Sequence, residues 1–287
     1  MQSENKASDT VYRHLIQQLI GMICACYVMS CSGGGSQVGA VLSSADDNRD
    51  ELLQVLEHYR NIPLKLEAAR FLIANMPAHR TYVGKEIDSL KRMKKESIQK
   101  GRISDEIVAH WKSFDYSSSQ VVKDIDVIKA DILIENIDLA FEAWEKRSWS
   151  KQYSFEDFCE YVLPYRIGDE PLEKWRRIYY ERYSPVLDSL YQGNDVVEAA
   201  RVMANYLKEE GFTNHTDFNL PHLGALFLLE NRVGYCRDNC DIATYVMRSL
   251  GIPITMDFYE MSPSYNSRHF WSALIDTTGL VVPFNYI

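Results

Sequence analysis

The residues best suited to chemistry lie in the last part of the sequence, where Cys236 precedes a strongly helical pattern. Apolar residues recur there at helical spacing, and Gly251 before Pro253 predicts the end of the helix. Gly234 allows a tight entry, which places Cys236 at the N-terminal end. The free amides and the macrodipole of that end favour a thiolate, the nucleophilic form of cysteine. The pattern therefore predicts Cys236 as a nucleophile.

His269 and Asn285 lie on segments that alternate between apolar and polar residues, which predicts strands over 253–260, 268–275 and 280–286. The turn between the last two pairs Asp276 with Leu280, so that Asn285 becomes a diagonal neighbour of His269 across the ladder. Asp276 itself lies roughly 23 Å along the strand from His269. Asn285 is therefore the residue expected to orient the His269 imidazole.

These residues carry a family resemblance. The stretch from Gly234 to Asn285 resembles the transglutaminase-like superfamily, a branch of the papain-like Cys–His–Asp/Asn enzymes. The family's motifs match at Gly234, Cys236 and Asp238, then at Arg248, Leu250, Gly251, Ile252 and Pro253, and then at His269 and Trp271. The family's final Asp falls on Asn285, a residue that papain-like relatives use in the same role.

The resemblance implies an α+β fold, with a helical N-terminal region followed by a nucleophile helix packed on an antiparallel sheet. It implies covalent catalysis without a cofactor on a peptide or protein amide. Cys236 would attack the carbonyl, His269 would return the proton to the leaving amine, and Asn285 would fix the imidazole tautomer. The Cys236 backbone N–H would supply one oxyanion donor. The second donor stays open among Asn214, His215, Asn219 and Asn231.

Hydrolysis and amide exchange both stay open, because water or an amine could resolve the thioester. Protease, transglutaminase and peptide N-glycanase activities all occur on this scaffold. The Asn at position 285 also leaves a second hypothesis, a catalytically inactive module of the same fold that binds a partner through its helical half and its tyrosines.

Neighbouring residues receive simpler roles. Tyr235 is expected to form a wall of the cleft, and Asp238 to be a favourable charge in the first helical turn. Cys240 lies one turn from Cys236 and is expected to pack inertly, with a redox partner of the nucleophile as the alternative. Cys159 stands among aromatic residues and is expected to be a buried thiol. A metal site on Cys236, Cys240 and His269 is not expected, because no clear fourth ligand and no zinc-like spacing accompany them.

The start of the chain predicts export. Lys6 and Arg13 precede an apolar stretch that ends at Ser30-Cys31, which resembles a bacterial lipoprotein signal with Cys31 as the lipidated residue. Residues 1–30 would then be removed, and residues 31–45 would form a flexible tether. The expected location is the bacterial cell envelope, with the protein lipid-anchored to a membrane and facing the periplasm or the exterior.

We expect residues 46–194 to form a helical region of unknown function and residues 195–287 to form the transglutaminase-like core. Two alternatives stay open for the C-terminal end of this core, a truncation of a longer protein or a minimal core. Predicted helices in the first region include one begun by Pro63, a charged one over 84–98, the longest over 121–146 and one begun by Pro171. A capping box at Ser154 and Asp157 predicts a short helix. The basic run Lys91, Arg92, Lys94 and Lys95 is expected on a solvated face. The net charge of −9 argues against nucleic-acid binding.

Overall fold

The computed structural model describes residues 35–99, 119–214, 220–261 and 268–285, with a few single positions between 105 and 117. The predicted signal peptide, Cys31, His215 and Asn219 lie outside the described residues. Residues 35–44, predicted as part of a flexible tether, form a helix in which Val38 and Val41 are buried.

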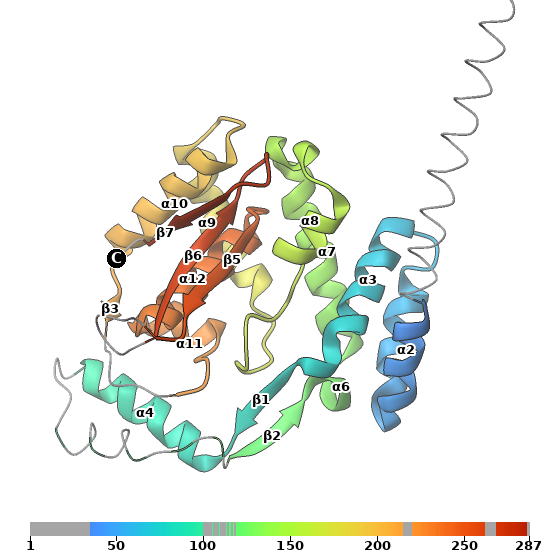
Figure 1. Ribbon diagram of the computed structural model, residues 1–287, viewed down its shortest axis with the longest axis horizontal. Coiled ribbons are helices and arrows are strands. Elements are labelled where there is room, and N and C mark those ends of the chain that lie inside the picture. Colours follow the sequence, from blue (N-terminus) through green and yellow to red (C-terminus); the bar gives the residue numbers. More distant parts are fainter. Residues whose placement is uncertain are drawn as a thin grey trace, which may run out of the picture.

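One hydrophobic core joins the N-terminal helices. Leu52, Leu72, Leu133 and Phe158 are buried in it, each from a different helix. These helices are α2 (Arg49–His58), α3 (Pro63–Asn75), α7 (Ala130–Lys146) and α8 (Phe155–Tyr161), with 3-10 turns at Asp46–Asn48, Met76–Ala78 and Ser148–Gln152. Figure 1 shows α2 and α3 at one edge of the molecule and α7 and α8 between them and the sheet. Pro63 is the first residue of α3, as predicted.

The single long helix predicted over 121–146 is wrong. The chain instead forms a strand, β2 (Gln120–Lys123), a short helix, α6 (Asp124–Val127), and then α7 after a break. Ile128 has ψ 137° and Lys129 ψ 147°, which are extended values that no helix allows. β2 pairs antiparallel with β1 (Arg80–Val83), a long-range contact that periodicity does not reveal.

The charged helix α4 (Lys85–Gln99) differs from the expectation that its basic residues lie on a solvated face. Its basic residues do not all face solvent, because Lys94 is fully buried while Arg92 is exposed. Lys94 follows Leu90 by four residues and Ile87 by seven, and both of those side chains are buried. Burial lowers the pKa of the Lys94 amine to about 8, although the nearby Asp238 carboxylate acts in the opposite direction.

The second core surrounds α12 (Cys236–Ser249) and includes most of the C-terminal half. Tyr179, Met203, Leu228 and Leu274 are buried in it. The elements that contribute are α9 (Arg176–Leu190), α10 (Val196–Glu210), α11 (Ala225–Asn231), and the strands β5 (Ile254–Tyr259), β6 (His269–Ile275) and β7 (Val281–Phe284). The helix predicted from Pro171 begins only at Arg176.

Helix α12 packs on an antiparallel sheet, so the predicted α+β arrangement is confirmed. The strand order is β5-β6-β7, and Figure 1 shows the sheet lying across α12. The predicted register at the hairpin is also confirmed, since the Asp276 amide donates to the Leu280 carbonyl at 2.9 Å and Ser272 pairs with Phe284. Gly279 has φ +82°, the left-handed value that the predicted turn requires.

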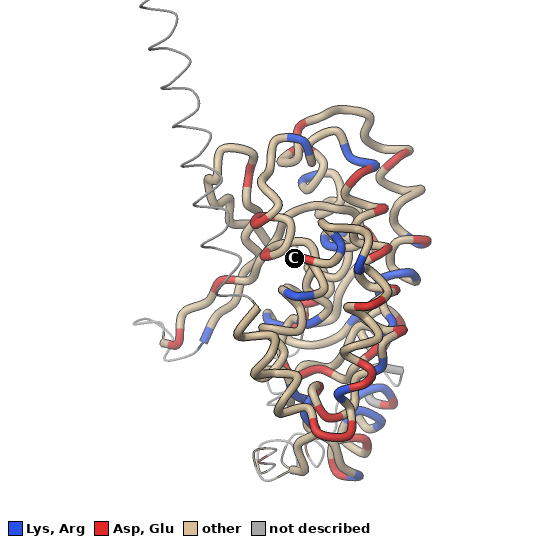
Figure 2. The backbone as a smooth tube through the Cα atoms, turned by 90° about the vertical axis from the view of Figure 1, so that its right-hand side faces the viewer, with Lys and Arg blue, Asp and Glu red and all other residues tan. Residues whose placement is uncertain are grey.

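The loop after α7 contacts the C-terminal end of α12 and links the N-terminal helices to the core around α12. Arg147 donates to the Leu250 carbonyl at 3.2 Å, and the Trp149 indole donates to the Gly251 carbonyl at 2.9 Å. Trp149 and α9 belong to the same core as α12, so part of the predicted helical region packs with the predicted catalytic core. Within the described ranges, no helix is long and apolar enough to span a bilayer. Acidic and basic residues are interspersed along the backbone in Figure 2.

Candidate active site

Cys236 is the first residue of α12, as predicted. Tyr235 precedes it in extended conformation, and its amide donates to Asp238 Oδ2 at 3.0 Å, which caps the helix. A Cβ added to Gly234 would meet the Asp238 Cβ at 2.3 Å, so only glycine fits the entry. Gly234 also ends β4 (Val233–Gly234), which pairs in parallel with β3 (Thr213–Asn214). The Asp238 cap and the pairing of β4 with β3 therefore both hold the N-terminal end of α12 in place.

The three described cysteines differ in their surroundings. Cys236 is half-buried, whereas Cys159 and Cys240 are buried. Burial raises the pKa of the Cys159 thiol to about 12, and burial likewise raises the pKa of the Cys240 thiol. The burial of these two agrees with the packing roles predicted for them. Among the described cysteines, Cys236 is the thiol that a reagent or substrate could reach.

The sheet turns one face of β6 toward α12. The Ser272 side chain interacts with the Cys240 thiol, and the Phe270 ring contacts the Tyr235 ring with centroids 6.1 Å apart. Side chains alternate along a strand, so His269 and Trp271 point to the opposite face.

On that opposite face, His269 and Trp271 contact each other and Tyr259. The His269 and Tyr259 ring centroids are 5.8 Å apart, and those of His269 and Trp271 6.2 Å. Within the described part of the chain, no hydrogen bond joins His269 to Cys236. The structure therefore groups His269 with Trp271, and Cys236 with Tyr235 and Cys240.

Asn285 follows β7 and is exposed. Because Ser272 pairs with Phe284, Asn285 comes next along the strand, across from Trp271 and on the face of His269. This is the diagonal placement expected from the sequence. Among the described residues, the β6–β7 pairing begins at Ser272, and the segment from His269 to Trp271 pairs with β5.

Two of the four oxyanion candidates lie among the described residues. Asn214 is exposed in β3. The Asn231 side-chain amide donates to the Phe227 carbonyl at 2.9 Å, which commits it to its own helix.

A buried polar stripe on α12 was missed by the sequence reasoning. His222 Nδ1 lies 2.7 Å from Asp241 Oδ2, and both side chains are almost wholly buried. Burial alone would lower the pKa of His222, but the Asp241 carboxylate outweighs it, so that the net shift is upward. Arg237, Asp241 and Tyr245 recur at a spacing of four residues, and that polar recurrence within a helix was the available signal.

Asp238 lies at the centre of a second buried cluster at the start of α12. Arg237 Nη2 is 3.4 Å from its Oδ1, and the buried Lys94 amine interacts with its charge. Arg237 also donates to the Leu220 carbonyl at 2.8 Å. The predicted first-turn charge is therefore buried and flanked by two cations, one of them from α4.

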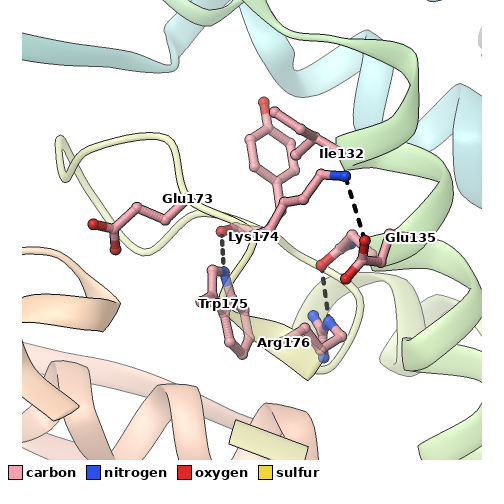
Figure 3. Close-up of a pocket in the computed structure, with 8 residues that line it drawn as sticks. Ile132, Glu135, Glu173, Lys174, Trp175 and Arg176 are labelled. Carbon is pink, nitrogen blue, oxygen red and sulfur yellow. Dashed lines mark hydrogen bonds and ion pairs between the residues drawn. The ribbon is translucent and has the colours of Figure 1, made fainter. Parts of the chain in front are cut away.

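The described cavities do not include the Cys236 thiol among their lining residues. Figure 3 shows one, a crevice of about 10 Å³ beside Trp175, where Lys174 pairs with Glu135 and Arg176 donates to Asn136 at 2.8 Å. It has room for about one water molecule. A larger hollow of about 300 Å³ lies between the start of α10 and the turn after β6.

Within the described ranges, no group of three or more His, Cys, Asp or Glu side chains could hold a metal ion.

Comparison with known proteins gives little further support. No protein-family model matches the sequence, and no curated protein matches it. Among solved structures, the periplasmic domain of TgpA from Pseudomonas aeruginosa, bound to ethylmercury, is similar at a TM-score of 0.30 and 15% identity. The match covers 50% of this chain and 49% of that one, so the chain spans about half the length of that structure. A likeness of this extent carries no functional argument.

Proposed function

We propose that this chain is a transglutaminase-like thiol enzyme of the bacterial cell envelope, lipid-anchored through Cys31, that hydrolyses or exchanges peptide-like amide bonds. The observation that carries the proposal is the position of Cys236. It is the first residue of a helix packed on an antiparallel sheet, and it is half-buried where Cys159 and Cys240 are buried. The first amides of that helix have no partner within it and can stabilise negative charge that develops during the attack.

In the proposed reaction, Cys236 Sγ bonds to the amide carbonyl carbon and the C–N bond breaks, which leaves a thioester and a free amine. Water or a second amine then attacks the thioester and releases the thiol. The Cys236 backbone N–H is placed to donate to the oxyanion, because the first amides of a helix have no partner within it.

His269 is the proposed carrier of the proton, and Asn285 the proposed orienting residue. For these roles the ends of β6 and β7 that carry His269 and Asn285 must both turn from the Tyr259 face toward α12, which breaks the pairing of His269 with Tyr259. His269 is the first residue of β6, so the change is confined to the end of that strand.

A second candidate function is a catalytically inactive module of the same fold that binds a partner. The observation that favours it is the placement of His269, which packs with Tyr259 and Trp271 on the sheet face away from α12. In that arrangement the His269 imidazole would not assist the Cys236 thiol.

The rate of Cys236 alkylation against pH separates the two candidates. Iodoacetamide labelling of the full chain would be followed by mass spectrometry at Cys236, with Cys159 and Cys240 as internal references. The enzyme predicts fast labelling near pH 6 that slows in His269→Ala and Asn285→Ala. A profile like that of a free thiol with a pKa of about 8.5, unchanged in His269→Ala, would refute the enzyme and favour the binding module.

A further inference from the structure

Three aromatic rings lie together on the α12 side of the sheet. Phe258 and Phe270 are stacked with centroids 5.4 Å apart and planes 24° apart, and Tyr235 meets Phe270 edge-on at 6.1 Å. Phe270 is 9% exposed and Phe258 49% exposed. The three rings therefore form a continuous aromatic wall that runs from the protein interior to solvent.

This aromatic wall adjoins the Cys236 thiol. Tyr235 immediately precedes Cys236, and Cys240, one helical turn farther on, interacts with the Ser272 side chain. Ser272 lies two residues beyond Phe270 on the same face of β6. Cys236 lies one turn before Cys240 on α12, and Phe270 lies two residues before Ser272 on β6. Cys236 and Phe270 are therefore at the same end of these two elements, where Tyr235 contacts Phe270.

The chemistry of the wall is apolar. The Arg237 guanidinium lies 4.9 Å from the Tyr235 ring centre, but it is buried and committed to Asp238 and the Leu220 carbonyl. The outer ring, Phe258, is half in water, so covering it removes apolar surface from solvent. A second ring stacked in series on Phe258 would gain the same offset contact that Phe258 makes with Phe270.

We infer that Tyr235, Phe258 and Phe270 form a subsite that selects an aromatic or large apolar side chain next to the amide attacked by Cys236. This inference rests on the proposed function for its reaction, but the subsite can be tested without turnover. The occupant is an apolar side chain of a peptide-like substrate, because the wall offers ring faces to bind.

The test compares two haloacetamides on the full chain, iodoacetamide and N-benzyl iodoacetamide. In each case Cys236 Sγ bonds to the methylene carbon, iodide leaves with the electron pair of the C–I bond, and the thiol proton passes to solvent. The rate ratio of the benzyl reagent to the plain reagent at Cys236 is divided by the same ratio for glutathione, which removes the intrinsic difference between the reagents. We expect a preference of about three- to tenfold for the benzyl reagent.

Phe258→Ala should reduce this preference to about that of glutathione, since it removes the half-exposed ring. Tyr259→Ala is the matched control, because Tyr259 is the next residue of β5, is 38% exposed and packs on the opposite sheet face. It should retain the preference. Because the wild-type Phe258 side chain is half-exposed, its truncation leaves no cavity in the core.

Equal ratios at Cys236 and glutathione would overturn the inference. It would also be overturned by a preference that persists in Phe258→Ala or that Tyr259→Ala removes equally. The absolute rate of plain iodoacetamide and its pH profile test the proposed function separately. A Cys236 with the pH profile of a free thiol but a clear benzyl preference would refute the enzyme and support the subsite.

Discussion

Asp238 offers the sharpest test of how the start of α12 is held. Its side chain is 1% exposed, caps the Tyr235 amide and faces two cations, Arg237 and the buried Lys94 amine. Asp238→Asn keeps an oxygen that can accept from the Tyr235 amide but removes the negative charge. Breaking a buried ion pair from one side costs about 3–5 kcal/mol. Arg237 keeps its bond to Leu220, so the lower end, about 3 kcal/mol, is expected.

Asp238→Ala also removes the cap, which adds about 1 kcal/mol, so the expected loss is about 4 kcal/mol. Urea unfolding followed by tryptophan fluorescence measures both variants against the wild-type chain. Glu209→Gln, an exposed carboxylate on α10, is the control and should stay within about 0.5 kcal/mol of wild type.

A double variant isolates the buried charge. Adding Lys94→Met to Asp238→Asn removes an amine that has lost its anion, so the double variant should lose less stability than the sum of the two single changes. If Asp238→Asn unfolds within about 0.5 kcal/mol of wild type, the buried-charge reasoning is wrong. If the two single changes add without coupling, Lys94 does not depend on Asp238.

Three further changes test other parts of the structure. Burial lowers the pKa of Lys94 from 10.5 to about 8, so between these two pH values the unfolded chain binds more protons than the folded chain. The free energy of unfolding should therefore rise with pH in that interval. Urea unfolding at several pH values should show this rise for the wild-type chain and not for Lys94→Met. Gly251→Ala should lower the free energy of unfolding by more than about 2 kcal/mol, because φ is +70° and the new Cβ would meet the Ala143 carbonyl oxygen at 2.9 Å. Gly279→Ala, at φ +82° with open space around it, should lower it by about 1 kcal/mol. Equal losses would refute the steric argument. Cys159, whose pKa rises from 9.0 to about 12, should alkylate about a thousandfold more slowly at pH 8 than after unfolding in urea, as read by mass spectrometry.

Local rules determined much of the site. The helix from Cys236, its end before Gly251 and the hairpin at Asp276 follow from periodicity and turn chemistry, and all were predicted correctly. The register of β6 and β7 follows from that turn, so the placement of Asn285 on the His269 face was also available. These features depend on residues close together in the chain.

Long-range pairing decided where the helices break. The segment 121–146 has an apolar stripe that suits one helix, yet its first part is a strand paired with β1, some forty residues earlier. Lys94 is a similar case. Its place on the apolar stripe of α4 was visible, but only the fold supplies the Asp238 carboxylate that accompanies it into the interior.

The sequence by itself determined that His269 shares a strand face with Trp271, and Phe270 shares the other with Ser272, because side chains alternate with a period of two. It could not determine which face meets α12, since each face carries an aromatic residue and each could be buried. The tertiary structure decided this through contacts of Tyr235 with Phe270 and of Cys240 with Ser272, residues about thirty positions apart in the chain. Packing across that distance, rather than any local pattern, sets which side chains stand beside the Cys236 thiol.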